Sequence, residues 1–302
     1  MNDNSTSLKK TIGFFPALAT VMGTVIGTGV FFKAAAVTEY TGTVSMALFA
    51  WLLGGLISIC AGLTGAELAA MFPETGGLTR YIEHTYGHFW GFLAGWAQAI
   101  IYFPANVAAI AIAFGTQFTN LFNLSQTWIV PVAIITALSL LLVNCISAKF
   151  GGWVTSVALV VKLIPLAVIV LLGFFHSSSV NFSLFPVVAG PHRAFWTALG
   201  NGLLATMFAY DGWIHVGNIA GEMKNPRKDL PKAIALGIGL IMVVYLLVNA
   251  VFLYIAPVNH VAGNLNIASD VAKVIFGGIG GKFVTIGILI SVYGELNGYT
   301  MK

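Results

Sequence analysis

The sequence predicts an all-α membrane protein that crosses the bilayer several times and has two broken spans. Three observations lead to this prediction. Of the 302 residues, 58% are hydrophobic and 8% are charged, whereas a soluble domain carries roughly 25% charged residues. The apolar residues gather in runs of about 20 or more, which is the length of a transmembrane helix. Two of these runs are interrupted near their centres by glycines.

Eight apolar runs are long enough to cross a membrane, and we expect a single transmembrane domain over residues 1–302. The runs cover residues 12–36, 43–71, 88–119, 127–148, 153–175, 194–221, 232–257 and 281–301. The linkers between them are short and hold turn-forming residues, as in 73-PETGG-77 and 225-NPRKDLP-231. Residues 265–281 are less apolar and predict a short interfacial helix before the last span.

Lysine and arginine are distributed unequally between the two faces of the membrane. If the N-terminus is cytoplasmic, the inner face carries nine of these residues and the outer face, which includes Lys33, carries four. Cytoplasmic loops hold the excess of positive charge, so we expect a multi-pass protein of the cell membrane with a cytoplasmic N-terminus. The net charge of +4 then reflects basic loops and indicates no nucleic-acid partner. The sequence identifies the lipid bilayer as a partner, and no protein partner can be read from it.

Patterns typical of catalysis or metal binding do not stand out. His84 and His88 have helical spacing but lack a third ligand, so we expect neither a metal site nor a cofactor. Cys60 and Cys145 lie in apolar segments, which disfavours a disulfide. Without a nucleophile–base pair or a phosphate-binding loop, an enzyme is not predicted.

The first broken span contains 23-GTVIGTG-29. A glycine inside a helix costs about 0.5–1 kcal/mol relative to alanine, and backbone at bilayer depth leaves the helix only where it lines a cavity or is buried in protein. A break here would free the amides of Thr28 and Gly29, at the positive end of the second half-helix, for a carboxylate. It would also free carbonyls near Val25 and Ile26, which suit an ammonium group.

The second broken span contains 206-TMFAYDGW-213 and would free the carbonyls of Phe208 and Ala209. Paired breaks at corresponding positions of two halves indicate a transporter built from inverted repeats. Two facing breaks would bind a zwitterion, which suggests a free amino acid as the substrate. The alternative is that glycines such as Gly23 and Gly27 only allow close packing of helices.

At these residues the sequence resembles the amino acid–polyamine–organocation superfamily, and within it the L-type amino acid transporter branch with its bacterial serine/threonine exchangers. Four motifs in order carry the resemblance: 23-GTVIGTGVF-31, 66-AELAAMFPETGGLTRYI-82, 207-MFAYDGWIHVGNIAGEMKNPRKDLPKAI-234 and the weaker 291-SVYGELNG-298. The third is the most specific of them.

The resemblance implies a broken-helix fold with two inverted repeats of five helices and twelve spans in all. It also implies a secondary transporter that exchanges small neutral L-amino acids, such as serine and threonine, by alternating access and without sodium. The sequence stops near the end of the eighth span, so the first repeat is complete and the second partial. We therefore expect a fragment or a truncated chain, and the alternative function is a non-transporting remnant or an amino-acid-binding subunit.

By the same resemblance, Thr28 and Gly29 would bind the substrate carboxylate. The carbonyls of Val25, Phe208 and Asp211 would bind the amine, and the Phe208 ring would close over the substrate from outside.

The depth of Lys162 within its span predicts that its ammonium either loses its charge or finds carbonyl partners. The resemblance assigns roles to two further positions. Asn297 matches a position that contacts substrate. Lys162, deep within its span, would take the place of a sodium ion that bridges the first and fifth spans in sodium-coupled relatives.

Four more polar residues at membrane depth each have more than one possible role. Asp211 would cap the second half of its span, contact a polar or amine group, or carry a proton. Glu295 would line the pocket and favour a polar or cationic substrate, or pair with Lys162. Tyr102 and Asn106 would line the pocket or form hydrogen bonds between helices.

Overall fold

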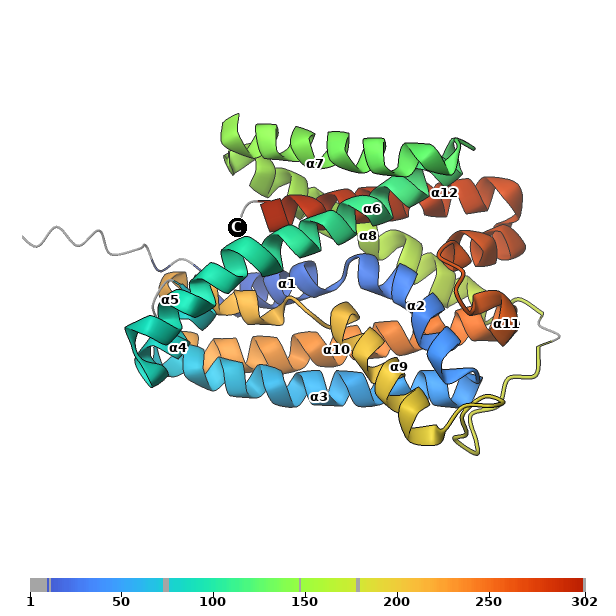
Figure 1. Cartoon of the computed structure of the whole chain (residues 1–302), viewed down its shortest axis with the longest axis horizontal. Helices are drawn as coiled ribbons and strands as arrows, with labels where there is room; N and C mark the ends of the chain where they lie inside the picture. The colour runs from blue at the N-terminus through green and yellow to red at the C-terminus, as the bar shows by residue number, and fades with distance from the viewer. Residues whose placement is uncertain (1–9, 11, 73–75, 147, 178–179, 301–302) are drawn as a thin grey trace, which may run out of the picture.

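The computed structural model describes residue 10 and residues 12–72, 76–146, 148–177 and 180–300. This part of the chain is built of helices, with a single isolated β-bridge between Ile12 and Met223. Most of the helices run side by side along the long axis of the molecule (Figure 1). The prediction of an all-α protein is confirmed.

The helices follow one another with short connections, apart from the loop between α8 and α9. In chain order they are α1 (Phe14–Val25), α2 (Thr28–Thr41), α3 (Val44–Met71), α4 (Gly77–Tyr86), α5 (His88–Ala97), the π-helix η1 (Gln98–Tyr102), α6 (Phe103–Leu121), the 3-10 helix η2 (Gln126–Trp128), α7 (Ile129–Ile146), α8 (Ala148–Gly173), α9 (Phe195–Ala209), the 3-10 helix η3 (Trp213–Glu222), α10 (Pro226–Ile255), α11 (Val258–Val261) and α12 (Ile267–Thr300).

Several of these helices have the length and composition of membrane spans. Within the described residues, five pass both criteria: α3, α5 continued through α6, η2 continued through α7, α10 and α12. The pair α1 and α2 passes together as a broken span bent by 45°. A shorter apolar stretch, Val161–Gly173, lies within α8.

The boundaries of two helices differ from the apolar runs for identifiable reasons. The first broken span continues to Thr41, beyond the predicted end at residue 36, and Lys33 lies inside α2. The last helix begins at Ile267 and is kinked at Gly277, whose φ of 75° suits glycine. The stretch before this kink matches the short helix expected ahead of the last span.

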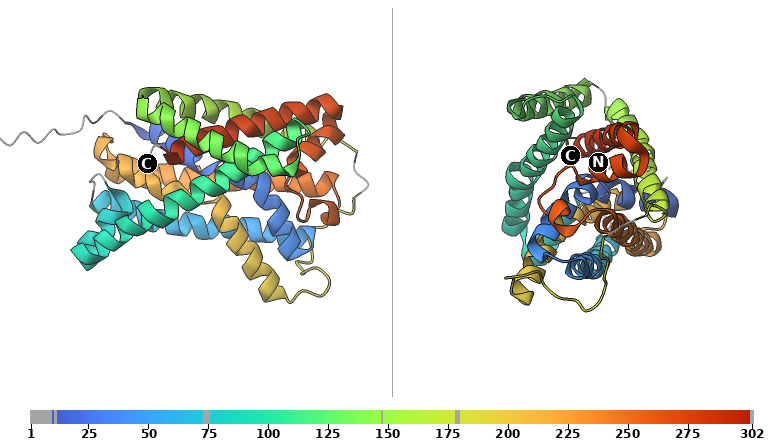
Figure 2. Two further views of the ribbon diagram at one scale, coloured as in Figure 1. Left: turned by 45° about the horizontal axis from the view of Figure 1, so that its top comes forward. Right: turned by 90° about the vertical axis from the view of Figure 1, so that its right-hand side faces the viewer.

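The broken pair α1 and α2 lies in the middle of the bundle, between two groups of helices. On one side α1 packs against α10 and α2 against α9, while α3 packs against both α10 and α9. On the other side α12 contacts α2 and packs against α6 and α8 (Figure 1). α7 lies at the rim of the bundle (Figure 2), and only 17% of the residues in the apolar window of its span are buried.

Three aromatic rings fix the packing beside the breaks. Trp51 of α3 lies edge-on to Tyr210 and to Tyr245 of α10, with ring centroids 5.9 and 5.5 Å apart. The Tyr210 hydroxyl donates a hydrogen bond to the carbonyl of Trp51 at 3.0 Å. Because Tyr210 directly follows α9, this cluster holds the end of that helix against α3 and α10.

Candidate functional site

The first span is broken between Val25 and Thr28. Ile26 has φ −72° and ψ 109°, an extended conformation that ends α1, and α2 begins after Gly27. A Cβ on Gly27 would overlap the carboxylate of Glu295. The glycine therefore permits a side chain from α12 to reach the backbone at the break.

The second span is broken between Ala209 and Trp213. Gly212 has φ 110°, a conformation that favours glycine, and a Cβ there would lie 2.7 Å from the carbonyl oxygen of Thr24. The chain then continues as the 3-10 helix η3. The N-cap of η3 is Gly212, which has no side chain to cap the helix. Asp211 therefore does not hold the capping position that one of its interpretations gave it.

The two breaks lie in direct contact. A Cβ on Gly29 would lie 2.5 Å from the Cα of Ala209. The Tyr245 hydroxyl is 2.9 Å from the carbonyl oxygen of Val25 and 3.1 Å from that of Ala209. A hydroxyl has one hydrogen, so Tyr245 shares it between the carbonyl ends of both broken helices.

Glu295 of α12 lies at the amide end of the first break. Its Oε2 accepts a hydrogen bond from the backbone N–H of Thr28 at 2.6 Å, and its Oε1 is 3.5 Å from the Thr28 hydroxyl. The first N–H groups of a helix have no partner within the helix, and the dipole there favours an anion. A carboxylate thus occupies the place where the sequence predicts one to bind.

Lys162 of α8 lies at the carbonyl end of the same break. Its side chain is 2% exposed, and its ammonium donates hydrogen bonds to the carbonyls of Gly23, at 2.7 Å, and of Ile26. Burial of an ammonium without such partners would cost several kcal/mol. The contact joins α8 to α1, the fifth span to the first.

A second polar group joins the end of η1 to the second break and to the start of η3. The Tyr102 hydroxyl donates a hydrogen bond to the carboxylate of Asp211, and Nε2 of His215 is 3.4 Å from the same hydroxyl. Tyr102 ends the π-helix η1, a distortion that often occurs at functional sites. Among the interpretations of Asp211, this arrangement favours contact with a polar group.

The other predicted residues have partners outside the two breaks. The Asn106 amide donates to the carbonyl of Tyr102 at 2.9 Å, within its own span. Asn297 is fully buried and accepts a hydrogen bond from Asn144 of α7 at 3.0 Å. The Phe208 ring lies under the ammonium of Lys33, 4.3 Å from the ring centroid.

The N-terminal end of α1 is joined to the end of η3 through the backbone. The amide of Ile12 donates to the carbonyl of Glu222 at 3.0 Å, and the amide of Lys224 donates to the carbonyl of Ile12 at 2.9 Å. Beside them, Tyr81 of α4 packs against Gly217 of η3. Burial raises the pKa of Tyr81 to about 12.

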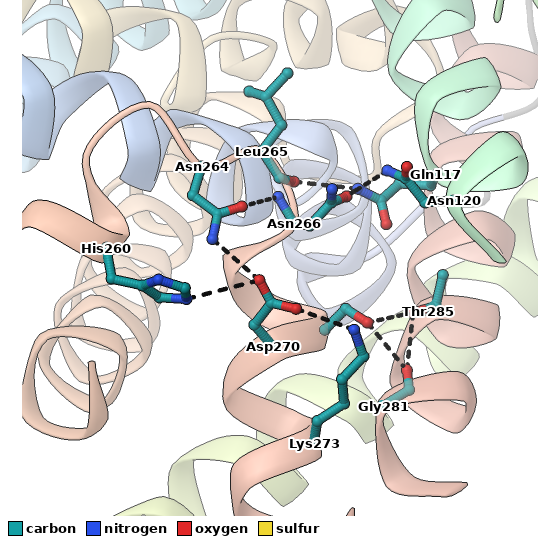
Figure 3. A network of polar contacts seen from close by, with 11 residues as sticks. Gln117, Asn120, His260, Asn264, Leu265, Asn266, Asp270, Lys273, Gly281 and Thr285 are labelled. Carbon is teal, nitrogen blue, oxygen red and sulfur yellow. Dashed lines mark hydrogen bonds and ion pairs between the residues drawn. The ribbon is translucent and has the colours of Figure 1, made fainter. Parts of the chain in front are cut away.

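The opposite end of the bundle holds a separate polar network (Figure 3). Gln117 of α6 donates to the carbonyl of Leu265 at 3.1 Å and to Asn266 at 2.9 Å. Asp270 of α12 accepts from Asn264 and pairs with Lys273, both at 3.0 Å. These contacts tie the link between α11 and α12 to α6, and they border a cavity of about 390 Å³ that lies away from the breaks.

Sequence reasoning missed two residues of this arrangement. Tyr245 is a polar group in the middle of the apolar run of α10, and that position at membrane depth could have indicated an internal partner. His215 carries a similar signal, because an ionisable side chain within the apolar run 194–221 also indicates an internal partner.

Comparison with known proteins places these features in a family. The amino acid permease family matches residues 12–302, nearly the whole sequence. This chain belongs to the amino acid permease family. The resemblance read from the four motifs is thereby confirmed, and the chain is a multi-pass membrane protein whose relatives are transporters.

The chain is similar to several curated transporters. It is 42% identical to the serine/threonine exchanger SteT of Bacillus subtilis, with 100% of this chain aligned to 68% of that protein. It is 30% identical to Asc-type amino acid transporter 1 of Mus musculus and to the large neutral amino acids transporter small subunit 2 of Homo sapiens. In both mammalian cases the alignment covers 97% of this chain and 56% of the relative, so the chain spans just over half their length.

A solved structure supports the fold of this chain. The nucleobase-cation-symport-1 family transporter Mhp1, in a closed conformation with bromovinylhydantoin bound, superposes with a TM-score of 0.54 at 18% identity. The match covers 98% of this chain and 67% of Mhp1. The fold is the broken-helix inverted-repeat fold, as the two interrupted spans predicted.

Proposed function

We propose that this member of the amino acid permease family is a secondary transporter of small neutral L-amino acids, with serine and threonine as its first candidate substrates. The observation that carries the proposal is the carboxylate on the backbone N–H of Thr28. It supports the view that the first N–H groups of α2 can donate hydrogen bonds to the carboxylate of an amino acid. Thr28 and Gly29 would supply the donors, as the motif suggests.

The amine end of the substrate would lie on carbonyls of the two breaks. The carbonyls of Val25, Ile26 and Ala209 already accept hydrogen bonds from Tyr245 or Lys162, but a carbonyl oxygen has a second lone pair. With the carbonyls of Phe208 and Asp211, they would form the ammonium site. These groups bind the part that all amino acids share, so side-chain selection would come from residues such as Tyr102, Asn106 and Asn297.

Transport would be independent of sodium. The Lys162 ammonium lies on the carbonyls of Gly23 and Ile26, where the resemblance places a sodium ion in sodium-coupled relatives. A fixed positive charge there removes the need for a bound cation and opposes its entry.

We also propose eight crossings, with α8 and α9 continued by η3 as the two that complete the set, and a cytoplasmic N-terminus in the cell membrane. The name of the 42% identical relative, an exchanger, supports exchange as the mode of transport. The two breaks would serve as hinges for alternating access.

Uptake of radiolabelled L-serine by proteoliposomes that hold this chain tests the proposal. We expect uptake that requires unlabelled serine or threonine inside and is the same in sodium and in choline buffer. Sodium-stimulated uptake would contradict the role given to Lys162. Binding of serine without uptake would favour the alternative, an amino-acid-binding protein that does not transport.

Two variants at one position give the matched control. Thr28→Pro removes the N–H at the first position of α2, where proline fits the helix, and we expect serine binding to be lost. Thr28→Val keeps the N–H and removes the hydroxyl, and we expect binding to weaken but persist. Equal binding by both variants would exclude the Thr28 amide as the carboxylate ligand.

A further inference from the structure

The place predicted for a substrate carboxylate already holds a side chain of the protein. The Glu295 carboxylate accepts the Thr28 N–H at 2.6 Å and contacts the Thr28 hydroxyl. Its approach leaves no room for a Cβ at Gly27. Glu295 reaches this point from α12, 267 residues away in the chain, so the contact is a tertiary one built into the fold.

The charges around the break reproduce those of a bound amino acid. Glu295 supplies a carboxylate at the amide end, and Lys162 supplies an ammonium at the carbonyl end, on Gly23 and Ile26. The two side chains attract each other electrostatically. Glu295 and Lys162 together therefore satisfy the polar backbone that a zwitterion would otherwise satisfy.

We propose that the Glu295 carboxylate is an internal competitor for the Thr28 amide, and that the carboxylate of an incoming amino acid must displace it. This inference rests on the proposed function of the same site. One N–H cannot donate fully to two carboxylates, and two like charges at this distance repel. Glu295 is partly exposed and its side chain is flexible. The carboxylate can therefore leave the Thr28 amide while α12 stays in place.

A ligand without a carboxylate gains nothing from displacing Glu295. Ethanolamine, which is serine without its carboxylate, would use only the carbonyl end of the break. Removal of the Glu295 charge should therefore increase the affinity for serine and leave the affinity for ethanolamine unchanged. This contrast separates competition at the amide from a general loosening of the site.

The test is binding of radiolabelled L-serine and ethanolamine to the full chain in lipid nanodiscs. Glu295→Gln keeps the size of the side chain and replaces the carboxylate by a weaker neutral acceptor. A hydrogen bond to a charged acceptor is stronger than one to a neutral acceptor, so the Gln side chain competes less well for the Thr28 amide. We expect this variant to bind serine on the order of tenfold more tightly, with no gain for ethanolamine. Glu39→Gln, the same exchange at an exposed residue near the end of α2, should change neither ligand.

Unchanged or weaker serine binding by Glu295→Gln would overturn the proposal, as would an equal gain for ethanolamine. A second measurement does not depend on any ligand. Hydrogen exchange at the Thr28 amide should be faster in Glu295→Ala than in Glu39→Ala, because the first loses the acceptor. If no variant binds any amino acid, the proposed function has failed; faster exchange would still support Glu295 as the internal ligand, and unchanged exchange would refute it.

Discussion

Gly29 of α2 and Ala209 of α9 meet backbone to backbone: a Cβ on Gly29 would lie 2.5 Å from the Cα and 2.7 Å from the Cβ of Ala209. The start of one half-helix thus rests on the end of another from the second repeat. Since protein interiors are close-packed, neither helix can shift here without moving its partner. The contact couples the two breaks that form the candidate site.

Gly29→Ala should separate these helices. The added methyl meets backbone atoms, which cannot rotate away, and overpacking of this kind costs about 1–3 kcal/mol. We expect a lower melting temperature of the purified chain and loss of serine binding. Gly200→Ala on α9 is the control, because a Cβ there meets nothing within 4 Å. If Gly29→Ala melts as high as Gly200→Ala, the two breaks are not in contact.

Tyr245→Phe should loosen the carbonyl ends of both breaks. The substitution removes the hydroxyl shared between Val25 and Ala209 but keeps the ring against Trp51. A buried acceptor left unpaired costs about 1–3 kcal/mol, so we expect a lower melting temperature and weaker serine binding. Tyr40→Phe, at a tyrosine that is 44% exposed, should match the unsubstituted chain. Indistinguishable melting of the two variants would mean that the shared hydroxyl stabilises neither break.

The sequence predicted both broken spans because their cause is local. Glycines at 23, 27 and 29, and an acid beside Gly212, are unfavourable in a membrane helix whatever lies around them. The deep position of Lys162 likewise predicted an internal partner. The structure supplies carbonyls of the first break as that partner, as the resemblance had suggested.

Other features depend on how distant helices face each other. The rotation of α12 decides that Glu295 reaches Thr28, and the spacing of glycines carries no information about that rotation. The second half of the sixth span is a 3-10 helix without a side-chain cap, so the local preference of Asp211 for a capping position yields to its contact with Tyr102. Long-range side-chain contacts of this kind cannot be read from one sequence.

Lys162→Met should destabilise the protein more than the loss of a surface charge would. It leaves the carbonyls of Gly23 and Ile26 without their donor and Glu295 without its nearby positive charge. Removal of one partner from a buried charged group costs about 3–5 kcal/mol, and we expect a correspondingly lower melting temperature. Lys228→Met, at an exposed residue of α10, should have little effect.

The double variant Lys162→Met/Glu295→Gln tests whether these two charges act together. With neither charge present, no unpaired charge remains at the break, so the combined loss in melting temperature should be smaller than the sum of the single losses. Additive losses would show that Lys162 stabilises the break through the carbonyls alone.

Gly217→Ala should disturb the end of the bundle where η3 meets α4, and a second substitution should repair it. A Cβ on Gly217 would lie 2.5 Å from the Tyr81 hydroxyl oxygen and 3.4 Å from Cζ, the nearest atom of the Tyr81 ring. The hydroxyl is buried and has no hydrogen-bond partner within the described residues, so Tyr81→Phe alone should cost little. In Gly217→Ala/Tyr81→Phe the added methyl would make only an ordinary van der Waals contact with the Phe ring. We therefore expect the double variant to recover most of the decrease in melting temperature caused by Gly217→Ala. Failure of the double variant to recover would place the damage in the backbone of η3 rather than at Tyr81.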